Sequence, residues 1–378
     1  MPDVGIYRGE RTGRRGPTPK KRIEIAEWVR REIVCGRLRP GDRLPPRSWF
    51  QKRFTPNANV VNAAFRELAS DGFVETRGAA ARGTVVARKL PYAGRYLLLV
   101  KAHDEDGGYN FFSSALKMAA RELERRRGIK FDVVGVADAS GDGEDSAEYG
   151  RVVERVRRHL YSGVVAQHVN RDHGQDTVLN LDYVPMTYFG NTSEFAQGGW
   201  VKRLSYRPES FVSLFSVHFG ECLDAGARRA AVFAADPARE FAARGEALVR
   251  SAAAEHGVDL DENGLHFVPM AHWRRGRSQF ERLVRLFLAY AEGRGIDAVI
   301  LGDDNFLAPF EKACAEMYGG RPPFRVLCHC NSPCMPKTSL DVSFHGLDCT
   351  ATLSTFVDYA EALLSGAANP PEPRRMYV

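Results

Sequence analysis

The sequence predicts an α/β protein in two parts, a small head of three helices and a β-hairpin followed by a larger body with two lobes. Three observations predict this. Helical hydrophobic periodicity near the N-terminus gives way to two short strand-like runs before residue 90. After that point apolar strands alternate with amphipathic helices, in two successive sets. A polar stretch broken by proline and glycine separates the two parts.

This pattern divides the chain into four segments. We expect a basic flexible tail over residues 1–19, a head over 20–88, a linker over 89–95 and a two-lobed ligand-binding and dimerisation domain over 96–378. Charge follows the same division. Residues 1–90 hold 20 Lys+Arg against 9 Asp+Glu, a net charge of +11, whereas the rest holds 33 against 38, a net charge of −5. A basic head on an acidic body indicates that the head meets a polyanion.

Composition excludes several classes of protein. The 378 residues are 44% hydrophobic and 26% charged, as in ordinary globular proteins. No apolar run is long enough to span a bilayer, and the first sixteen residues lack the apolar core of a signal peptide. Seven cysteines, an odd and scattered number, do not resemble a disulfide framework. We therefore expect a cytoplasmic protein with reduced thiols and no membrane contact.

The head begins with two helices. The first is expected over 23–35, because Ile25, Val29 and Ile33 recur on one helical face. The stretch GRLRPGDRLPP is too rich in glycine and proline to continue it, and a short second helix is expected over 47–54.

The third helix is expected to start after Asn57, a good N-cap residue, or alternatively after Thr55, with Pro56 at the first helical position. Its apolar side, which would pack on the first two helices, holds Val61, Ala64, Phe65 and Leu68. Its opposite side holds Asn59, Asn62 and Arg66. Two strand-like runs, FVET and TVVA, then flank RGAAARG and predict a hairpin. Three helices and a hairpin make a winged helix-turn-helix.

A helix in the DNA major groove needs side chains that pair with base edges, and asparagine pairs bidentately with adenine. Arginines on the same helix and hairpin would hold phosphates or probe the minor groove. The residues expected to contact double-stranded operator DNA are Arg47, Asn57, Asn59, Asn62, Arg66, Arg77 and Arg82. The alternative is an amphipathic helix whose asparagines are only solvated. The hairpin and the charge asymmetry favour DNA binding.

The head resembles the DNA-binding domain of the GntR family of bacterial transcription regulators. The family pattern G-x-L-x-P-G-x-x-L-P, then L-x-x-x-G-[LF]-[IV], then G-T-x-V is present here at Gly36, Leu38, Pro40, Gly41, Leu44, Pro45, Leu68, Gly72, Phe73, Val74, Gly83, Thr84 and Val86. Two arginines that the family usually carries on its recognition helix are replaced by Ala58 and Asn62. The resemblance implies the fold but not the operator sequence, and we expect an operator with more A·T contacts than is usual for the family.

The body alternates strands and helices. Strands are expected over 96–102, 131–137, 163–169, 184–190, 229–235, 265–270, 298–302, 324–330 and 340–345. Helices are expected over 113–127, 148–159, 209–225, 238–256, 278–292, 306–317 and 349–364. Repeated β-α units predict parallel sheets with helices on both faces. Ligands bind such sheets at the carboxyl ends of the strands.

The body is similar to the LacI/periplasmic-binding-protein-type effector domain. Tyr109-Asn110-Phe111-Phe112 stands where that family has N-P-F-F, and IDAVILGDDNFLAPF resembles its D-A-[IV]-x-x-x-N-D-x-x-A-x-G motif. The closing stretch from LDVSFHG to ALLSG matches the family's last strand and helix. The family's ligand-touching arginine in R-x-x-G is replaced by Ala242, three residues before Gly245. This departure leaves the ligand class open.

The residues expected to contact a small-molecule ligand are Phe111, Phe112, Asn191, Asp304 and Asn331. The aromatic rings would stack on an apolar ligand face, Asp304 would accept hydroxyl or amine hydrogens, and the asparagines would follow strand ends. The alternative is that the phenylalanines belong to the core and that Asp303 and Asp304 only cap the following helix.

Two further patterns predict no site. In CHCNSPC, Cys328 and Cys330 would point to one face of a strand and His329 to the other, so we favour buried thiols over a metal ligand set. The sequence contains no nucleophile–base motif, phosphate loop or H-E-x-x-H motif, so we expect neither an enzyme nor a bound cofactor.

The sequence thus predicts a ligand-responsive, DNA-binding transcription regulator that acts as a homodimer. The resemblance implies a repressor and, as effector, a sugar such as a monosaccharide. An alternative is a small-molecule-binding protein whose degenerate head binds DNA without specificity. A third interpretation is that the body only dimerises and binds no ligand.

Overall fold

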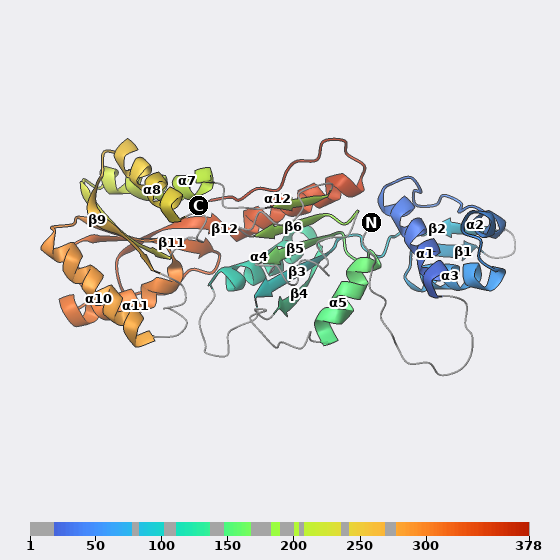
Figure 1. The fold of residues 1–378 in the computed structure, drawn as a ribbon, viewed down its shortest axis with the longest axis horizontal. Coiled ribbons are helices and arrows are strands. Elements are labelled where there is room, and N and C mark those ends of the chain that lie inside the picture. Colours follow the sequence, from blue (N-terminus) through green and yellow to red (C-terminus); the bar gives the residue numbers. More distant parts are fainter. Residues whose placement is uncertain are drawn as a thin grey trace. The chain divides into compact units, whose positions relative to one another are not determined.

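The computed structural model describes residues 19–77, 83–101, 111–136, 147–167, 183–189, 200–203, 208–235, 242–268 and 277–377. The chain divides into two compact units. The first, which we call the head, comprises Met1–Ala93 together with the short segment Arg158–Leu160, and the second, the body, comprises Gly94–Arg157 and Tyr161–Val378. Figure 1 labels their elements.

The head has the predicted three helices and hairpin. Its elements are α1 Pro19–Val34, α2 Arg47–Phe54, α3 Ala58–Ser70, β1 Val74–Arg77 and β2 Gly83–Val86, the two strands pairing antiparallel. Helix α1 begins four residues earlier than predicted, because proline is well suited to a first helical position and the lysines and arginine after it favour helix. Of the two expected starts of α3, the structure has the one after Asn57, whose side chain caps the helix by accepting the Val60 N–H at 3.0 Å.

An aromatic cluster forms the centre of the head. Phe50 of α2 is fully buried, and its ring lies 5.2 Å from Phe65 of α3 and 5.7 Å from Trp28 of α1. The apolar side of α3 is buried as its periodicity predicts, with Val61, Ala64, Phe65 and Leu68 all at most 4% exposed. The polar side of α3 is therefore turned outward.

A buried ion-pair network fixes α3 against α1, and the sequence pattern did not predict it. Arg30 of α1 is 2% exposed and donates from Nη2 to Glu67 Oε1 at 2.7 Å and to Asp71 Oδ2 at 2.6 Å. A buried charge is costly unless it is paired, so these contacts specify how the two helices pack.

The body contains two five-stranded sheets, each entirely parallel. The first has the order β4-β3-β5-β6-β7, with strands β3 Arg95–Lys101, β4 Lys130–Val136, β5 Gly163–Gln167, β6 Met186–Phe189 and β7 Val201–Arg203. The second has the order β12-β11-β10-β8-β9, with strands β8 Arg229–Ala235, β9 Asp259–Val268, β10 Ala298–Leu301, β11 Arg325–Ser332 and β12 Val342–Asp348. The predicted parallel sheets are confirmed.

Helices accompany both sheets. They are α4 Phe111–Arg127, α5 Ala147–Arg157, α7 Pro208–Asp224, α8 Ala242–Glu255, α10 Arg277–Gly293, α11 Leu307–Tyr318 and α12 Cys349–Leu364, with a short 3₁₀ turn, η2, over Asp304–Phe306. We call the first sheet with α4, α5 and α12 the first lobe. The second sheet with α7, α8, α10 and α11 is the second lobe.

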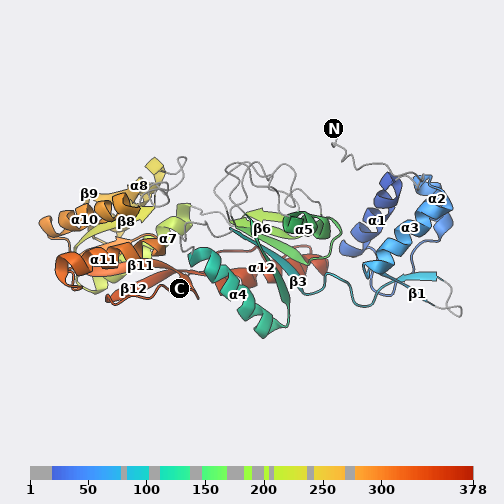
Figure 2. The same ribbon diagram turned by 90° about the horizontal axis from the view of Figure 1, so that it is seen from below.

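Side chains alternate across the first sheet and so build two apolar layers. Leu98 and Val100 pack with α4 and α12, whereas Leu97 and Leu99 pack with α5 on the opposite face. Figure 2 shows α5 on one side of the sheet and α4 with α12 on the other. Both faces of β3 are thus buried, which explains its uninterrupted apolar sequence.

Helix α12 follows a strand of the second sheet but packs in the first lobe (Figure 1). Leu353 and Phe356 lie in the apolar cluster of β3 and α4, and the Phe356 ring is 6.3 Å from that of Tyr96. Residue 163 has no side chain where Phe356 approaches β5, since a Cβ there would lie 2.7 Å from the Phe356 ring. Because α12 comes after the second sheet in the sequence, the first lobe is built from two separate stretches of the chain.

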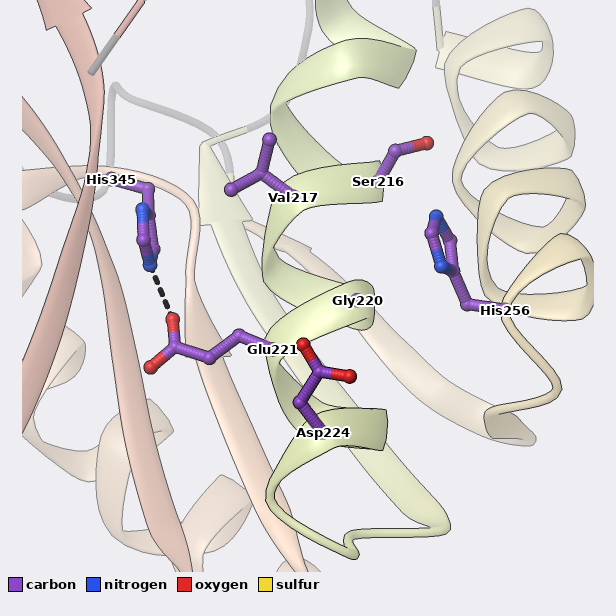
Figure 3. A pocket seen from close by; sticks show the side chains of 7 residues that line it. All are labelled: Ser216, Val217, Gly220, Glu221, Asp224, His256 and His345. Carbon is purple, nitrogen blue, oxygen red and sulfur yellow. Dashed lines mark hydrogen bonds and ion pairs between the residues drawn. The ribbon is translucent and has the colours of Figure 1, made fainter.

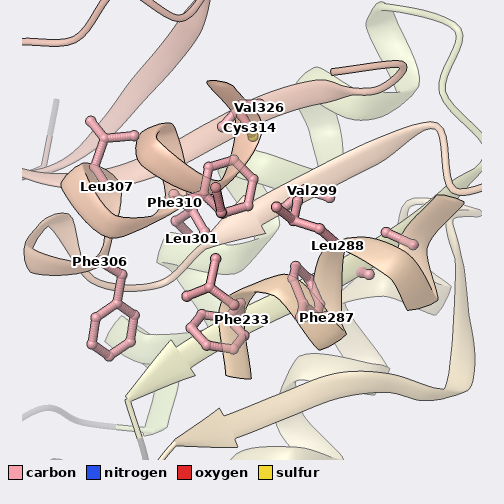
Figure 4. Packing of buried hydrophobic residues seen from close by; sticks show 14 of the residues in the cluster. Phe233, Phe287, Leu288, Val299, Leu301, Phe306, Leu307, Phe310, Cys314 and Val326 are labelled. Atoms are coloured by element: carbon pink, nitrogen blue, oxygen red, sulfur yellow. The ribbon is translucent and has the colours of Figure 1, made fainter. Parts of the chain in front are cut away.

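The second lobe is built around phenylalanines (Figure 4). The rings of Phe233, Phe280 and Phe306 lie 4.9 to 5.8 Å from one another, and Phe287 is 5.0 Å from Phe233. Phe306 is fully buried and comes two residues after Asp304. The core thereby anchors the turn that follows β10 and fixes where Asp304 lies.

All seven cysteines are free thiols. Burial raises the pKa of Cys330 and Cys314 to about 12, so neither is a ready nucleophile or ligand near neutral pH. Among the helices that the structure describes, none combines the length and apolar character that crossing a bilayer requires.

Candidate DNA-binding surface and ligand site

The outer face of α3 presents the polar side chains that the sequence predicted there. Asn59, Asn62 and Arg66 are exposed, whereas the residues between them on the opposite side are buried. Asn57 has a different position from these three, because its side chain is engaged in capping the helix. Its expected contact with DNA would therefore be made from the helix N-terminus, where backbone N–H groups favour phosphate.

Arg47 of α2 extends onto this face. Its Nε donates to Asn62 Oδ1 at 2.8 Å, and its guanidinium carbon lies 4.7 Å from the centre of the Phe65 ring. The sequence lacks an arginine at position 62, but the fold places the Arg47 side chain against it. The spacing of 15 residues between the two gave no signal of this contact.

The hairpin arginines are described only in part. Arg77 ends β1, where its backbone pairs with Gly83 of β2, and its side chain lies outside the described residues. Arg82 also lies outside them, as does Asn191.

The structure brings together Asp304 and Asn331 at the carboxyl ends of two neighbouring strands. Asp304 follows β10 and Asn331 is the last residue but one of β11, and Asn331 Nδ2 donates to Asp304 Oδ2 at 2.8 Å. The two side chains are 1% and 7% exposed. Asp303 caps the η2 turn by accepting the Asn305 N–H at 2.9 Å. Capping was the alternative for both aspartates, and the structure separates their positions: Asp303 caps, whereas Asp304 pairs with Asn331.

Two buried carboxyl groups side by side resist ionisation. Burial raises the pKa of Asp304 well above its usual range, the Asp303 charge raises it further, and the Asn331 hydrogen bond lowers it in part. Burial also raises the pKa of Asp303, against the hydrogen bonds from Asn305. The pair consequently holds a proton more readily than ordinary aspartates and can offer an O–H donor as well as acceptors.

The predicted phenylalanines lie on the first lobe. Helix α4 begins at Phe111 rather than at residue 113, so Phe111 and Phe112 form its first turn and are both half-buried. The Phe112 ring meets Phe189, the last residue of β6, edge to face at 5.0 Å. The next residue of the helix, Ser113, donates from Oγ to Gln167 Oε1, at the end of β5, at 2.7 Å.

Sequence reasoning missed the C-terminal residue Arg375. Its guanidinium carbon lies 5.4 Å from the centre of the Phe189 ring, and its charge contributes to lowering the pKa of His329 on β11. The closing sequence EPRRMYV has no helical or strand periodicity that would have indicated which arginine lies inward. Gln167 was also missed, although a polar residue that closes the apolar run GVVA at a strand end is a recognisable signal.

The CHC sequence lies on β11 as predicted. Cys328 packs into the phenylalanine-rich core of the second lobe, whereas His329 interacts with His218 of α7 on the opposite face. Within the described residues, no cluster of three or more His, Cys, Asp or Glu side chains is arranged to hold a metal ion.

A hollow of about 520 Å³ opens beside α7 (Figure 3). It is lined by Ser216, Val217, Gly220, Glu221, Asp224, His256 and His345. His345 Nε2 contacts Glu221 Oε2 on one side of the helix, and His256 stands on the other. Helices α7 and α8 lead into β8 and β9, so their C-terminal ends lie at the amino edge of the sheet. The hollow is therefore not at the edge where Asp304 and Asn331 meet.

Comparison with known proteins agrees with the two-part architecture. Residues 21–86 match the model of the bacterial regulatory proteins of the gntR family, so the head is a domain of this type. A search of curated protein sequences found no match to the chain.

The fold of the body is that of LacI-family regulators. A LacI family transcriptional regulator from Bifidobacterium animalis subsp. lactis superposes with a TM-score of 0.52 at 13% identity, covering 76% of this chain and 96% of that one. A probable maltose operon repressor, malR, from Staphylococcus gives 0.52 at 10% identity, covering 75% and 94%. The regulator CelR in complex with cellobiose gives 0.50 at 14% identity, covering 94% and 98%.

Proposed function

We propose that the protein is a ligand-responsive transcription regulator, whose head binds operator DNA and whose body binds a sugar or a sugar derivative. The observation that carries the DNA part is the exposed polar face of α3 in a gntR-type head. A helix with outward asparagines and arginines has the donors and acceptors that base edges and phosphates require.

The ligand part is supported by Asp304 and Asn331. Their hydrogen-bonded pair stands at the carboxyl ends of β10 and β11, the edge at which parallel α/β sheets bind ligands. A carboxyl and an amide can together bond vicinal hydroxyl groups. Two proteins with the fold of the body are named for cellobiose and for a maltose operon, which supports a sugar as the effector class here.

We further propose that the protein works as a cytoplasmic, non-enzymatic homodimer and represses transcription. Two heads on a two-fold axis would read a pseudo-palindromic operator, with half-sites one or more helical turns apart. The protein has one state that binds DNA and one that does not. A ligand changes the affinity for DNA only to the extent that the ligand binds one of these two states more tightly than the other.

A second candidate is a sensor whose head binds DNA without sequence preference. Ala58 and Asn62 favour it, because they stand where the family's recognition helix usually carries arginine. Such a head would bind through phosphate contacts alone, with a steep dependence on salt and no selected site.

The experiment that separates these two candidates is selection from a random DNA pool with the full-length protein at a fixed, near-physiological salt concentration. We expect enrichment of a two-fold-related site. Asn59→Ala and Asn62→Ala should each lower affinity for that site by about 1–3 kcal/mol, since each removes a side chain proposed to contact a base edge.

The matched control is Asn263→Ala, an exposed asparagine of the body whose loss should leave DNA binding unchanged. Binding that is indifferent to the Asn59 and Asn62 substitutions would contradict their assignment as base-reading residues. An unenriched pool, with and without sugars, would support the second candidate instead.

A further inference from the structure

We infer that Arg375, delivered by the C-terminal tail, is a specificity-determining residue of the ligand site and selects an effector that carries an anionic group, a carboxylate or a phosphate. This inference rests on the proposed ligand-sensing function. It identifies the chemical class of the ligand beyond the general class of sugars.

The tail is fixed on the start of α12 by backbone hydrogen bonds. The Asp348 N–H donates to the Met376 carbonyl at 2.8 Å, and the Met376 N–H donates to Thr352 Oγ1 at 2.9 Å. One turn further along the helix, the Thr355 hydroxyl accepts the Arg374 N–H and donates to the Arg374 carbonyl, both at 3.1 Å. The residues on both sides of Arg375 are thus held on α12.

The Arg375 side chain lies at the end of strand β6. Its guanidinium carbon is 5.4 Å from the centre of the Phe189 ring. Phe189 ends β6 and touches Phe112, one of the residues predicted to bind ligand. The Arg375 charge also acts on His329 of β11, two residues before Asn331.

The chemistry of this arrangement suits an anion. A guanidinium that lies on an aromatic face is oriented by the ring and presents its N–H donors in its own plane, where they match the two oxygens of a carboxylate or phosphate. Lysine or a neutral donor would not provide this fork. The Asp304 pKa, raised by burial, limits the negative charge that would otherwise repel such a ligand.

His329 provides a second polar atom in this region. Its side chain is 6% exposed, and its Nδ1 has no hydrogen-bond partner in the part of the chain that the structure describes. Burial and the nearby Arg375 lower its pKa to about 4, so the ring is neutral near neutral pH. A neutral imidazole can bond a ligand oxygen without adding charge, which leaves Arg375 as the charged determinant.

The test compares matched sugars on the full-length protein. Glucose, glucuronate and glucose 6-phosphate, and the same three forms of galactose, would be titrated by calorimetry. We expect one anionic form to bind at least about tenfold more tightly than its neutral parent sugar. Whether the uronate or the sugar phosphate binds more tightly identifies the anionic group that the site selects. Arg375→Gln should weaken that form by about 10- to 100-fold, the range of a charge-assisted hydrogen-bond pair, with little effect on the neutral sugar.

Two further variants keep the test interpretable. Arg374→Gln removes the same charge from an exposed neighbour and should leave affinity unchanged. Arg375→Lys keeps the charge and most of the packing, so it should fold if Arg375→Gln does not, and should retain only part of the anion preference. Thermal unfolding of each variant reports whether it is folded.

Tight binding of a neutral sugar with no gain from an anionic group, or an anion preference that survives Arg375→Gln, would overturn this inference and leave the proposed function intact. If none of the six compounds binds or changes operator affinity, the proposed sugar-sensing function fails, and this inference fails with it.

Discussion

His218 is a buried histidine whose surroundings disfavour its charged form. It is fully buried on α7, its ring lies 5.4 Å from that of His345, and both of its nitrogens are without a hydrogen-bond partner among the described residues. Burial lowers its pKa to about 3, and the neighbouring His329 and His345 contribute. His345 in turn contacts Glu221. Burial alone would raise the pKa of Glu221, but hydrogen bonds from Ser343 and His345 lower it overall.

These pKa values predict acid sensitivity. His218 and His329 have folded-state pKa values of about 3 and about 4, below the ordinary 6.5, so the unfolded chain binds more protons. Their contribution to stability is complete above pH 6.5 and is lost as the pH falls from there through about 4 for His329 and about 3 for His218. At pH 5 the loss is roughly 2 kcal/mol for each histidine.

Denaturant unfolding of the body between pH 7.5 and pH 5 measures this effect. His218→Leu should reduce the pH dependence, because it removes one of the histidines whose pKa is lowered in the folded protein. His256→Leu, at a half-exposed histidine on the other side of α7, serves as the control and should leave the slope unchanged. An equal slope in wild type and His218→Leu would contradict the assignment.

At the scale of single residues, the sequence predicted the polar face of α3 but not that a side chain from another helix lies on this face. Asn59, Asn62 and Arg66 follow from helical periodicity, which is a local property. The contact of Arg47 with Asn62 and the position of Arg375 over Phe189 depend on tertiary packing between segments far apart in the chain. For the same reason the pairing of Asp304 with Asn331 required the order of the strands, which periodicity does not give.

At the scale of the secondary-structure elements, Gly346 lets the backbone of β12 lie directly against that of β11. This residue is opposite Cys330 of β11, and a Cβ at position 346 would overlap the Cys330 carbonyl oxygen and lie 2.7 Å from the Cys330 nitrogen. Both atoms belong to the backbone of a buried strand, so a rotamer change cannot relieve the overlap.

We therefore expect Gly346→Ala to destabilise the body by about 3 kcal/mol or more, through overpacking and displacement of the strand. Gly150→Ala is a useful contrast, because Gly150 lies within α5 with no atom near the added Cβ and should be neutral or stabilising by about 0.5–1 kcal/mol. Chemical denaturation of both variants checks the pair. A Gly346→Ala protein as stable as wild type would show that β11 and β12 can separate freely at this point.

The elements missed or misplaced by the sequence analysis have physical explanations. Strand β7 is only three residues long and reads VKR, so it has neither the length nor the apolar pattern of a strand. Strand β9 begins at Asp259 rather than residue 265, because it lies at the edge of its sheet, where polar residues are tolerated. Helix α12 was placed at its observed bounds, since it follows directly from Asp348, a good N-cap.

At the scale of the whole molecule, the two-part architecture was accessible from sequence because it rests on composition and on the order of elements. The first ninety residues have a positive net charge and the remainder has a negative one, which indicates the boundary between head and body. The repeated β-α pattern identifies the body. The packing of α12 on the first sheet was not predicted. This helix directly follows a strand of the second sheet in the sequence, and no local sequence pattern indicates that it packs on the first sheet instead.

The proposed regulator must obey reciprocal coupling between its ligand and its operator. If a ligand changes operator affinity by some factor, the operator must change ligand affinity by the same factor, which is typically 5- to 150-fold. We expect ligand titrations with and without operator DNA to give the factor found from DNA titrations with and without ligand. A ligand that binds tightly but yields a factor of one would contradict effector function for that compound.

The path of α12 also determines when each part of the protein can fold on the ribosome. Most of the head has been made once residue 93 has emerged, with only Arg158–Leu160 still to come, but the first lobe lacks part of its apolar core until Leu353 and Phe356 have been made. At about 5–20 residues per second, the interval between the last strand of the first lobe and the end of α12 is roughly ten to thirty seconds. During that time we expect the nascent chain to expose the apolar face of β3 and α4 that α12 later covers.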